Sequence, residues 1–301
     1  MSDIKLFALE RGKARELPGQ SAVLEKSLQT LMEQNLEVLL GVRFLQSEYS
    51  TGPKHGGRID TLGIDENGSP VIIEYKRATN ENVINQGLFY LDWLMDHQAE
   101  FKLLVMEGLG QEATERIDWS APRLICIAGD FSRYDEHAVL QMNRNIELIR
   151  YRHFGAELLL LELVNAASAQ ERGGEGAGQA PGTYKTVTDT LAELSGPLRD
   201  LYEEVRAFLL AMGDDVQEKT LKYYVAFKRI KNFACLEVHP GKGCIAAFVK
   251  VNPDTKTAEP GFTRDVRKIG HFGTGDLEIT LRSRSDFERA RLLFLESYES
   301  S

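Results

Sequence analysis

The sequence is short of cysteine and of long hydrophobic runs. Only three cysteines occur in 301 residues, Cys126, Cys235 and Cys244, and no pair of them has the spacing of a zinc site. Isolated cysteines of this kind are typical of buried thiols in a reducing compartment. The longest apolar run, "ELLLLELV", falls well below the ~20 residues that a bilayer crossing needs, and the first residues show no signal-peptide pattern. We therefore expect a cytoplasmic protein without a membrane segment.

Positive charge is also in short supply. Lys and Arg number 36 against 45 Asp and Glu, a net charge of −9, which argues against a protein that coats nucleic acid without specificity. The balance is uneven along the chain: residues 1–165 hold 17 basic against 25 acidic side chains, a net of −8, whereas residues 222–271 hold 10 against 4, a net of +6. The C-terminal half therefore offers either ordinary solvated faces or a local basic surface for a polyanion.

The remaining composition is that of a globular protein with two domains. Apolar residues make up 43% and charged residues 27% of the chain, enough for a core in each half of a protein this long. Residues 165–184, rich in Gly, Ala, Gln and Pro, show no apolar periodicity and predict a flexible linker. The expected domains are thus residues 1–164 and 185–301.

Apolar periodicity predicts an α/β fold for the first domain. We expect a helix over 21–40 with Ser21 as its N-cap, two strands joined by the turn "DENGSP", a helix over 80–108, and then a strand, a helix and two strands. That order predicts a mixed sheet with helices on both faces. For residues 185–301 we expect a helix over 187–213, antiparallel strands and a last helix over 284–298, a smaller α+β domain.

Charged residues in one apolar strand carry the chemical signal. The run Val71–Ile73 continues directly into Glu74 and Lys76, and Asp60 lies on the preceding strand. Residues two apart on a strand share a face, so Glu74 and Lys76 point the same way, and the hairpin can bring Asp60 beside them. Buried carboxylates are tolerated when they coordinate a cation, and carboxylates with Mg²⁺ and a lysine suit phosphodiester hydrolysis.

The spacing of Asp60, Glu74 and Lys76 resembles the signature of the PD-(D/E)xK nuclease superfamily. Gly57-Arg58-Ile59-Asp60 matches the lead-in of the NucS-type, RecB-like endonuclease domain, a likeness that covers roughly residues 15–165. Gln86 and Tyr90, four apart on a predicted helix, look like the Q-x-x-x-Y motif of RecB-like members. The resemblance implies a restriction-endonuclease-like α/β/α core and a metal-dependent nuclease acting on DNA, in repair or in restriction-like defence.

The resemblance also implies roles for single residues. Asp60 and Glu74 would bind Mg²⁺, or Mn²⁺ in its place, with Glu25 as an auxiliary ligand, and Lys76 would orient or activate the attacking water. Gln86 and Tyr90 would line the DNA-binding side of the site. Arg58 and Arg77 are candidate phosphate contacts, although each suits an exposed or salt-bridging role equally well. His55, in the Gly-rich stretch "GPKHGG", is expected to be solvated in a mobile loop, as a phosphate contact if it has a role.

The C-terminal half resembles a domain of unknown function that often follows such nuclease domains and is sometimes labelled a predicted transport protein. NucS-type enzymes carry the nuclease domain last, whereas here it comes first, so mismatch specificity does not carry over. A homodimer, and a protein partner bound through residues 185–301, both stay open.

Several residues have plainer interpretations. Asp65 and Glu66 could compete as metal ligands, but "DENG" is turn chemistry and predicts solvated side chains. The alternative function is a non-catalytic module that binds nucleic acid or protein on a nuclease-derived scaffold, with the acidic cluster reduced to a structural ion-pair network.

Overall fold

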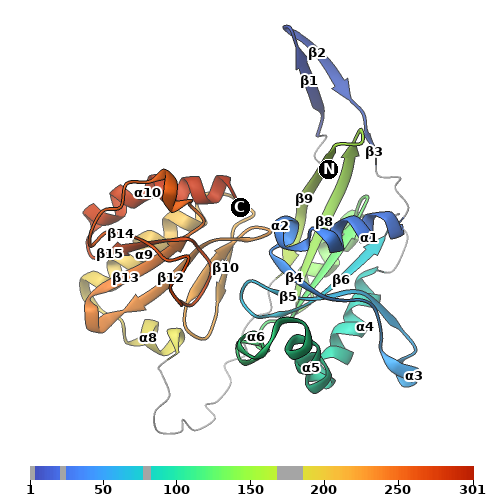
Figure 1. Ribbon diagram of the computed structural model, residues 1–301, viewed down its shortest axis with the longest axis horizontal. Helices are drawn as coiled ribbons and strands as arrows, with labels where there is room; N and C mark the ends of the chain where they lie inside the picture. Colours follow the sequence, from blue (N-terminus) through green and yellow to red (C-terminus); the bar gives the residue numbers. More distant parts are fainter. Residues whose placement is uncertain (1–3, 21–24, 77–82, 168–185) are drawn as a thin grey trace. The chain divides into compact units, whose positions relative to one another are not determined.

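The computed structural model divides the chain into two compact units, Met1–Glu171 and Arg172–Ser301 (Figure 1). The structure describes residues 4–20, 25–76, 83–167 and 186–301. Residues 165–167, where the sequence predicted the start of the linker, instead complete a strand. Their backbone pairs with the neighbouring strand as far as Ala167, and the Asn165 amide donates to the carbonyl of Glu136 at 2.6 Å. The rest of the predicted linker lies outside the described residues.

The N-terminal unit is built on a mixed sheet. Its helices are α1 (Glu25–Gln34), α2 (Leu36–Leu40), α3 (Gly52–His55), α4 (Val83–Asp96), α5 (Gln98–Leu109), α6 (Gln111–Glu115) and α7 (Arg133–Leu140). Its strands are β1 (Leu6–Glu10), β2 (Lys13–Leu17), β3 (Gly19–Gln20), β4 (Val42–Ser50), β5 (Arg58–Asp65), β6 (Pro70–Lys76), β7 (Arg123–Ala128), β8 (Asn145–Phe154) and β9 (Leu158–Ala167). The sheet runs β3-β8-β7-β6-β5-β4, with β9 paired to β8; β6, β7 and β8 are parallel and the other pairs antiparallel.

Helices cover both faces of this sheet, as the sequence predicted. On one face Ile72 and Leu124 join the same apolar cluster as Ile84 of α4. On the other face Thr61 donates its hydroxyl to Glu33 of α1 at 2.6 Å, and α1 contacts β5 and β6. The β1–β2 hairpin forms a separate two-stranded sheet that projects from the main one (Figure 1). The mixed α/β class is confirmed.

Two of the predicted helices are each broken in two. Asn35 interrupts the first helix. Its side-chain amide donates a hydrogen bond to the carbonyl of Leu31 at 2.9 Å, and its backbone N–H donates to the carbonyl of Met32. His97 interrupts the second, where its ring lies 2.7 Å from the carbonyl of Trp93 and stacks on the indole. The predicted cap Ser21 lies outside the described residues.

The sequence failed to predict strand β4. Only Val42 of its nine residues is buried, since the strand lies at the sheet edge and pairs with β5 alone. An edge strand with few buried side chains lacks the alternation on which strand prediction depends. This strand matters because it carries Glu48, which lines the candidate site.

The C-terminal unit is an α+β fold. A six-stranded antiparallel sheet runs β10-β11-β12-β13-β15-β14, with helices α8, α9 and α10 against one face. Its elements are α8 (Val187–Glu193), α9 (Gly196–Leu210), β10 (Gln217–Thr220), β11 (Val225–Lys228), β12 (Asn232–His239), β13 (Cys244–Val249), β14 (Thr263–Asp265), β15 (Leu277–Leu281) and α10 (Arg284–Glu299), with short 3-10 turns at Pro240–Lys242 and Pro253–Thr255. The single helix predicted over 187–213 is two helices, because Gly196 has a positive φ of 63° and Pro197 restarts the helix.

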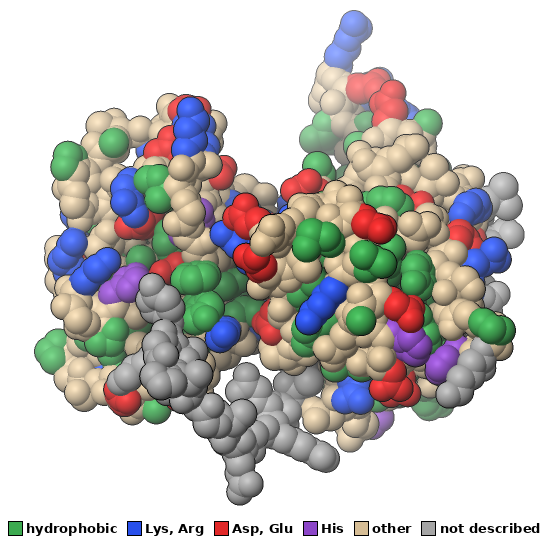
Figure 2. Space-filling view, turned by 60° about the horizontal axis from the view of Figure 1, so that its bottom comes forward, with side chains coloured by type: hydrophobic (Ala, Val, Ile, Leu, Met, Phe, Trp, Pro, Cys, Tyr) green, Lys and Arg blue, Asp and Glu red, His purple; other side chains and the backbone are tan. Residues whose placement is uncertain are grey.

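The basic segment of this unit is partly neutralised by carboxylates from outside it. Arg264 pairs with Glu278, Arg229 with Asp215 and Lys256 with Glu296. On the face drawn in Figure 2, blue and red side chains are interspersed and do not gather into one basic surface. The net charge of residues 222–271 therefore overstates the positive surface that the fold presents.

The scarcity of cysteine and of long apolar runs led to two predictions about the structure. The three cysteines are buried and form no disulfide, as predicted. Within the described ranges, every helix is too short or too polar to cross a membrane.

Candidate metal-dependent active site

The site forms where β5 and β6 separate. The ladder between them runs from Ile64 and Pro70 to Thr61 and Ile73 and then stops. Beyond it the backbone N–H of Tyr75 donates to Asp60 Oδ2 at 3.0 Å, and the N–H of Asp60 donates to Glu74 Oε1 at 3.2 Å. Each carboxylate thus satisfies the backbone of the opposite strand. The two carboxylates predicted from the sequence are therefore held side by side by the ends of both strands.

Burial makes this carboxylate pair reluctant to ionise. Glu74 is fully buried, and its removal from water, with the neighbouring charge of Asp60, raises its pKa to about 9. Burial likewise raises the pKa of Asp60, against the lowering effects of the Tyr75 N–H and the Lys76 ammonium. Without a cation, Glu74 therefore keeps its proton at neutral pH.

Gln86 and Tyr90 stand against the carboxylates from α4. Gln86 Nε2 donates to Glu74 Oε2 at 3.0 Å and to the Tyr90 hydroxyl at 3.3 Å, and the N–H of Arg58 donates to the same hydroxyl at 3.1 Å. The helix comes this close because residue 87 is a glycine: a Cβ there would lie 2.4 Å from Leu124 Cδ1 on β7. The structure thus brings both predicted motif residues into the site, while their contact with nucleic acid stays a prediction.

The predicted basic residues are paired with carboxylates. Lys76 Nζ lies 3.3 Å from Glu25 Oε1, and the Lys76 side chain is only 16% exposed. Arg58 Nε lies 2.8 Å from Glu48 Oε2, and Lys26 holds the other oxygen of Glu48 at 2.9 Å. Arg77 lies outside the described residues.

An open pocket of about 620 Å³ adjoins the pair. Asp60, Gln86 and Tyr90 line it together with Glu48 and glycines of the loop that contains α3. The loop is closed at its base, where the N–H of Gly57 donates to the Thr51 hydroxyl at 3.0 Å. His55 lies on the helical turn α3 and not in an irregular loop; its ring is half-buried, lines another open pocket and lies 5.6 Å from that of Phe89. A helical turn packed on α4 holds it.

Asp65 also corrects the sequence interpretation. It is 1% exposed, accepts hydrogen bonds from the backbone of Asn67 and Ser69, and pairs with Arg123 at 2.9 Å. Arg123 in turn pairs with Glu147 at 2.8 Å. Asp65 stands at the opposite end of β5 from Asp60, so this buried network supports the hairpin and is separate from the site.

Two contributors to the site were not recognised in the sequence. Gln29, on α1, is 3% exposed and donates to the carbonyl of Asp60 at 2.7 Å. A polar residue beside Leu28 on the apolar side of a helix was the available signal. Glu48 has a positive φ of 52°, which is rare for a residue with a side chain. No sequence pattern predicts this backbone conformation.

The donor set fits a hard divalent cation. Mg²⁺ commonly takes one or two carboxylates and completes its shell with water and phosphate oxygens. Asp60 and Glu74 supply two such carboxylates, and a cation would relieve the cost of burying them. Across the described ranges, no group of three or more His, Cys, Asp or Glu side chains comes together as a metal cluster. Glu25 faces Lys76, so its predicted role as a ligand has no geometric support among these residues.

The contact between Glu25 and Lys76 makes the role of Glu25 testable. We expect Glu25→Gln to leave Mn²⁺ affinity within about twofold of wild type, because the ion pair is half-exposed and the residue positions the ammonium rather than a metal. Calorimetric titration with Mn²⁺ measures this, with Asp60→Asn as the matched variant that should lose binding. A tenfold or larger loss in Glu25→Gln would restore Glu25 as a ligand.

Comparison with known proteins gives relatives of unassigned function. Residues 187–301 match a family model described as "Domain of unknown function" (DUF5655). An uncharacterized protein of Haemophilus influenzae is 29% identical over 296 residues, covering 95% of this chain and 96% of that protein. The shared length includes both units, so the order of the two units is the same in that relative.

Two solved structures also resemble part of the chain. One is a repair endonuclease from Pyrococcus abyssi, at 18% identity and a TM-score of 0.29; the other is an EndoMS complex with double-stranded DNA, at 20% identity and a TM-score of 0.25. Each match covers 42% of this chain, and the chain spans less than half of either structure, 47% and 44%. TM-scores this low do not by themselves establish a shared function.

Proposed function

We propose that the N-terminal unit is a metal-dependent nuclease that hydrolyses DNA phosphodiester bonds, in repair or in restriction-like defence. The observation that carries the proposal is the carboxylate pair. Asp60 and Glu74 meet where two central strands separate, Lys76 follows on the same strand, and an open pocket leads to Asp60. A purely structural acidic pair would have no need of a pocket beside it.

Each residue of the site has a separate proposed role in hydrolysis. Asp60 and Glu74 would hold Mg²⁺, or Mn²⁺ in its place, and the bound ion would supply charge neutralisation at the phosphate and a more acidic water. Lys76 orients the attacking water or stabilises negative charge as it develops on the phosphate. The Gln86 amide fixes Glu74 through its hydrogen bond, and Tyr90 braces the strand that carries Asp60 through the N–H of Arg58.

Support for DNA as the substrate comes from the sequence motifs. The lead-in Gly57–Asp60 and the Gln86/Tyr90 pair resemble those of DNA endonucleases, and the structure gathers them at one place. The side chain of Arg58 is 67% exposed beside the pocket and can reach a phosphate by leaving Glu48. Arg77 keeps the same proposed role as a phosphate contact.

One observation favours the alternative, a non-catalytic binding module. Both Lys76 and Arg58 are paired with carboxylates, so the site presents less positive charge than a polyanion prefers. The presence of the Asp, Glu and Lys together argues against this alternative, because a site that no longer catalyses hydrolysis does not need to retain all three. The two functions differ in a cleavage assay.

The test is cleavage of labelled single-stranded, duplex and branched DNA, and of RNA, with Mg²⁺ or Mn²⁺. Wild type is expected to cut at least one substrate, and Asp60→Asn and Lys76→Ala to lose more than about a hundredfold in rate. Asp118→Asn, which replaces a carboxylate that caps a turn through the N–H of Ser120, is the control and should cut like wild type. Equal inactivity of all four proteins, with nucleic acid still bound in a shift assay, would support the binding module.

A further inference from the structure

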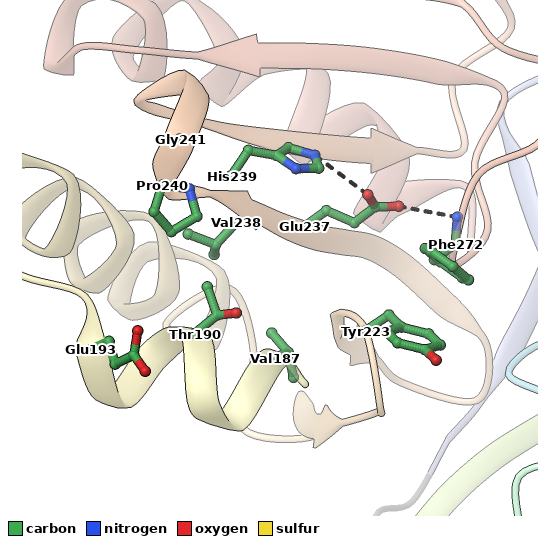
Figure 3. A pocket seen from close by; sticks show the side chains of 10 residues that line it. All are labelled: Val187, Thr190, Glu193, Tyr223, Glu237, Val238, His239, Pro240, Gly241 and Phe272. Atoms are coloured by element: carbon green, nitrogen blue, oxygen red, sulfur yellow. Dashed lines mark hydrogen bonds and ion pairs between the residues drawn. The ribbon is translucent and has the colours of Figure 1, made fainter. Parts of the chain in front are cut away.

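The C-terminal unit contains a second pocket, of about 460 Å³, which we call the C-terminal pocket (Figure 3). One wall is α8, whose residues Val187, Thr190 and Glu193 recur at helical spacing and point toward the cavity. The opposite wall is the end of β12, where Val238 faces α8 while Glu237 and His239 lie on the other face of the sheet. A volume of this size lies in the range of small-molecule sites and also holds one or two side chains.

The pocket exists because β11 is short. Its pairing with β12 reaches Leu236 opposite Val225, while β12 continues to His239 in pairing with β13. On the side where β11 has ended, β12 has an open edge, and the cavity extends round this edge from α8 to Glu237. The cavity is therefore a consequence of the sheet topology.

A carboxylate is fixed in position at this wall. Glu237 Oε1 accepts the backbone N–H of Phe272 at 3.0 Å, and Glu237 Oε2 lies 3.4 Å from His239 Nε2 (Figure 3). The Glu237 side chain is only 13% exposed. A carboxylate offers about four lone-pair sites, so two contacts leave it able to accept further hydrogen bonds from a ligand. An acceptor that is already oriented loses little entropy when a ligand binds.

Aromatic rings lie beside this carboxylate. Tyr223 and Phe272 line the same pocket, with ring centroids 4.5 Å apart and planes 32° apart. Phe272 is 47% exposed, a large apolar surface that stays in contact with water. Aromatic faces next to a carboxylate favour organic cations, since the ring quadrupole and the negative charge attract the same group.

The negative charge of the lining disfavours anionic ligands. Among the described residues, Glu193 and Glu237 line the cavity with two carboxylates, and Lys222 lies outside the lining with its Nζ 5.0 Å from the centre of the Tyr223 ring. A phosphate or another anion would meet repulsion from the carboxylates, which His239 and Lys222 offset only in part. The C-terminal pocket is thus unsuited to the nucleic-acid backbone that the N-terminal unit is proposed to cut.

We propose that the C-terminal pocket binds an organic cation, an ammonium or guanidinium group on an aliphatic stem. Glu237 accepts the charged N–H groups, and the stem packs on Val187 and the two aromatic rings. The same chemistry is offered by a Lys or Arg side chain of a partner protein and by a free diamine. This site is independent of the carboxylate pair in the N-terminal unit and does not require the chain to be a nuclease.

Calorimetric titration of the full-length chain at low salt tests the proposal. Agmatine serves as the free cation and an end-capped Ala-Arg-Ala peptide as the side chain, with AMP and butanol as anionic and neutral probes. At least one cationic probe should bind saturably, and neither control should. Binding of agmatine alone identifies a small-molecule site, whereas binding of the capped peptide identifies a site for a partner's side chain.

Matched variants assign the binding to this cavity. Glu237→Gln keeps an oxygen to accept the Phe272 N–H but removes the charge, and should weaken binding about tenfold or more. Glu278→Gln is the control, because Glu278 has the same 13% side-chain exposure on the same sheet but pairs with Arg264 away from the cavity. Thr190→Arg, which places the chain's own cation in the pocket, should abolish binding with Glu237 intact. Failure of both cationic probes, preference for AMP, or wild-type affinity in Glu237→Gln would each overturn the proposal.

Discussion

Glu74→Gln is expected to make the metal-free protein more stable at alkaline pH while it abolishes metal-dependent cleavage. The native state keeps the Glu74 proton up to a pKa of about 9, whereas the unfolded chain releases it near the ordinary value of 4.5. The native state therefore binds more protons between these values, and wild-type stability falls as pH rises through that window. Glutamine cannot ionise and avoids this loss, which amounts to a few kcal/mol, in order of magnitude, at about pH 8.

Thermal unfolding in EDTA, followed from about pH 5 to pH 9, measures the difference. The melting temperature of Glu74→Gln should exceed that of wild type by several degrees at the alkaline end, and the gap should close toward pH 5. Glu48→Gln is the control of opposite sign, because the hydrogen bond from Lys26 lowers the pKa of Glu48 and its charge stabilises the native state. A Glu74→Gln variant that is less stable than wild type at every pH would show that the carboxylate is ionised and compensated in the native state.

Metal affinity should rise steeply with pH. A cation can bind only the ionised pair, so binding must displace the proton of Glu74, and also that of Asp60 where Asp60 is protonated. Below the pKa of about 9 each displaced proton gives about a tenfold gain in affinity per pH unit. Mn²⁺ binding should therefore strengthen at least tenfold between about pH 6.5 and pH 7.5.

Buffers of different ionisation enthalpy reveal this proton directly. Calorimetry at one pH in two such buffers should give different apparent enthalpies of binding. The difference should equal the difference between the two buffers' heats of protonation, multiplied by the number of protons released, which should be close to one or more. An affinity that stays flat across this range, with no proton released, would mean that the metal binds away from Glu74.

The sequence predicted which of these residues come together better than it predicted the elements around them, while their role stays a prediction. Glu74 and Lys76 stood out because charge in an apolar strand is costly, and that signal is local. Gln86 and Tyr90 needed only helical spacing to be placed together. The contact of Glu25 with Lys76 depends on how α1 crosses the sheet, and no spacing along the chain contains that crossing.

The errors share a physical cause in tertiary contacts that override local pattern. Asp65 sits in a turn sequence, yet it is buried because Arg123, 58 residues later, requires a partner. The helix expected to run through Asn35 is an exception with a local cause, because that residue's own side chain breaks it. The basic segment of the C-terminal half loses part of its excess charge to carboxylates that the fold brings alongside, such as Glu278 beside Arg264.

The C-terminal pocket is another feature that the local sequence pattern did not predict. Glu237 and His239 lie two apart on a strand and gave no signal, since the partner of Glu237, Phe272, lies far away in the sequence. Only the early end of β11 turns these residues into the lining of a cavity. Function in this unit could not be read from spacing along the chain.

The measurement that tests the central claim most directly is calorimetric titration of Mn²⁺ at about pH 8 into wild type and Asp60→Asn. If Asp60 and Glu74 together hold the ion, wild type binds it saturably and Asp60→Asn loses the affinity by more than about tenfold, with its fold retained by circular dichroism. Equal binding by both proteins, or binding by neither, would contradict a metal site at the junction of β5 and β6.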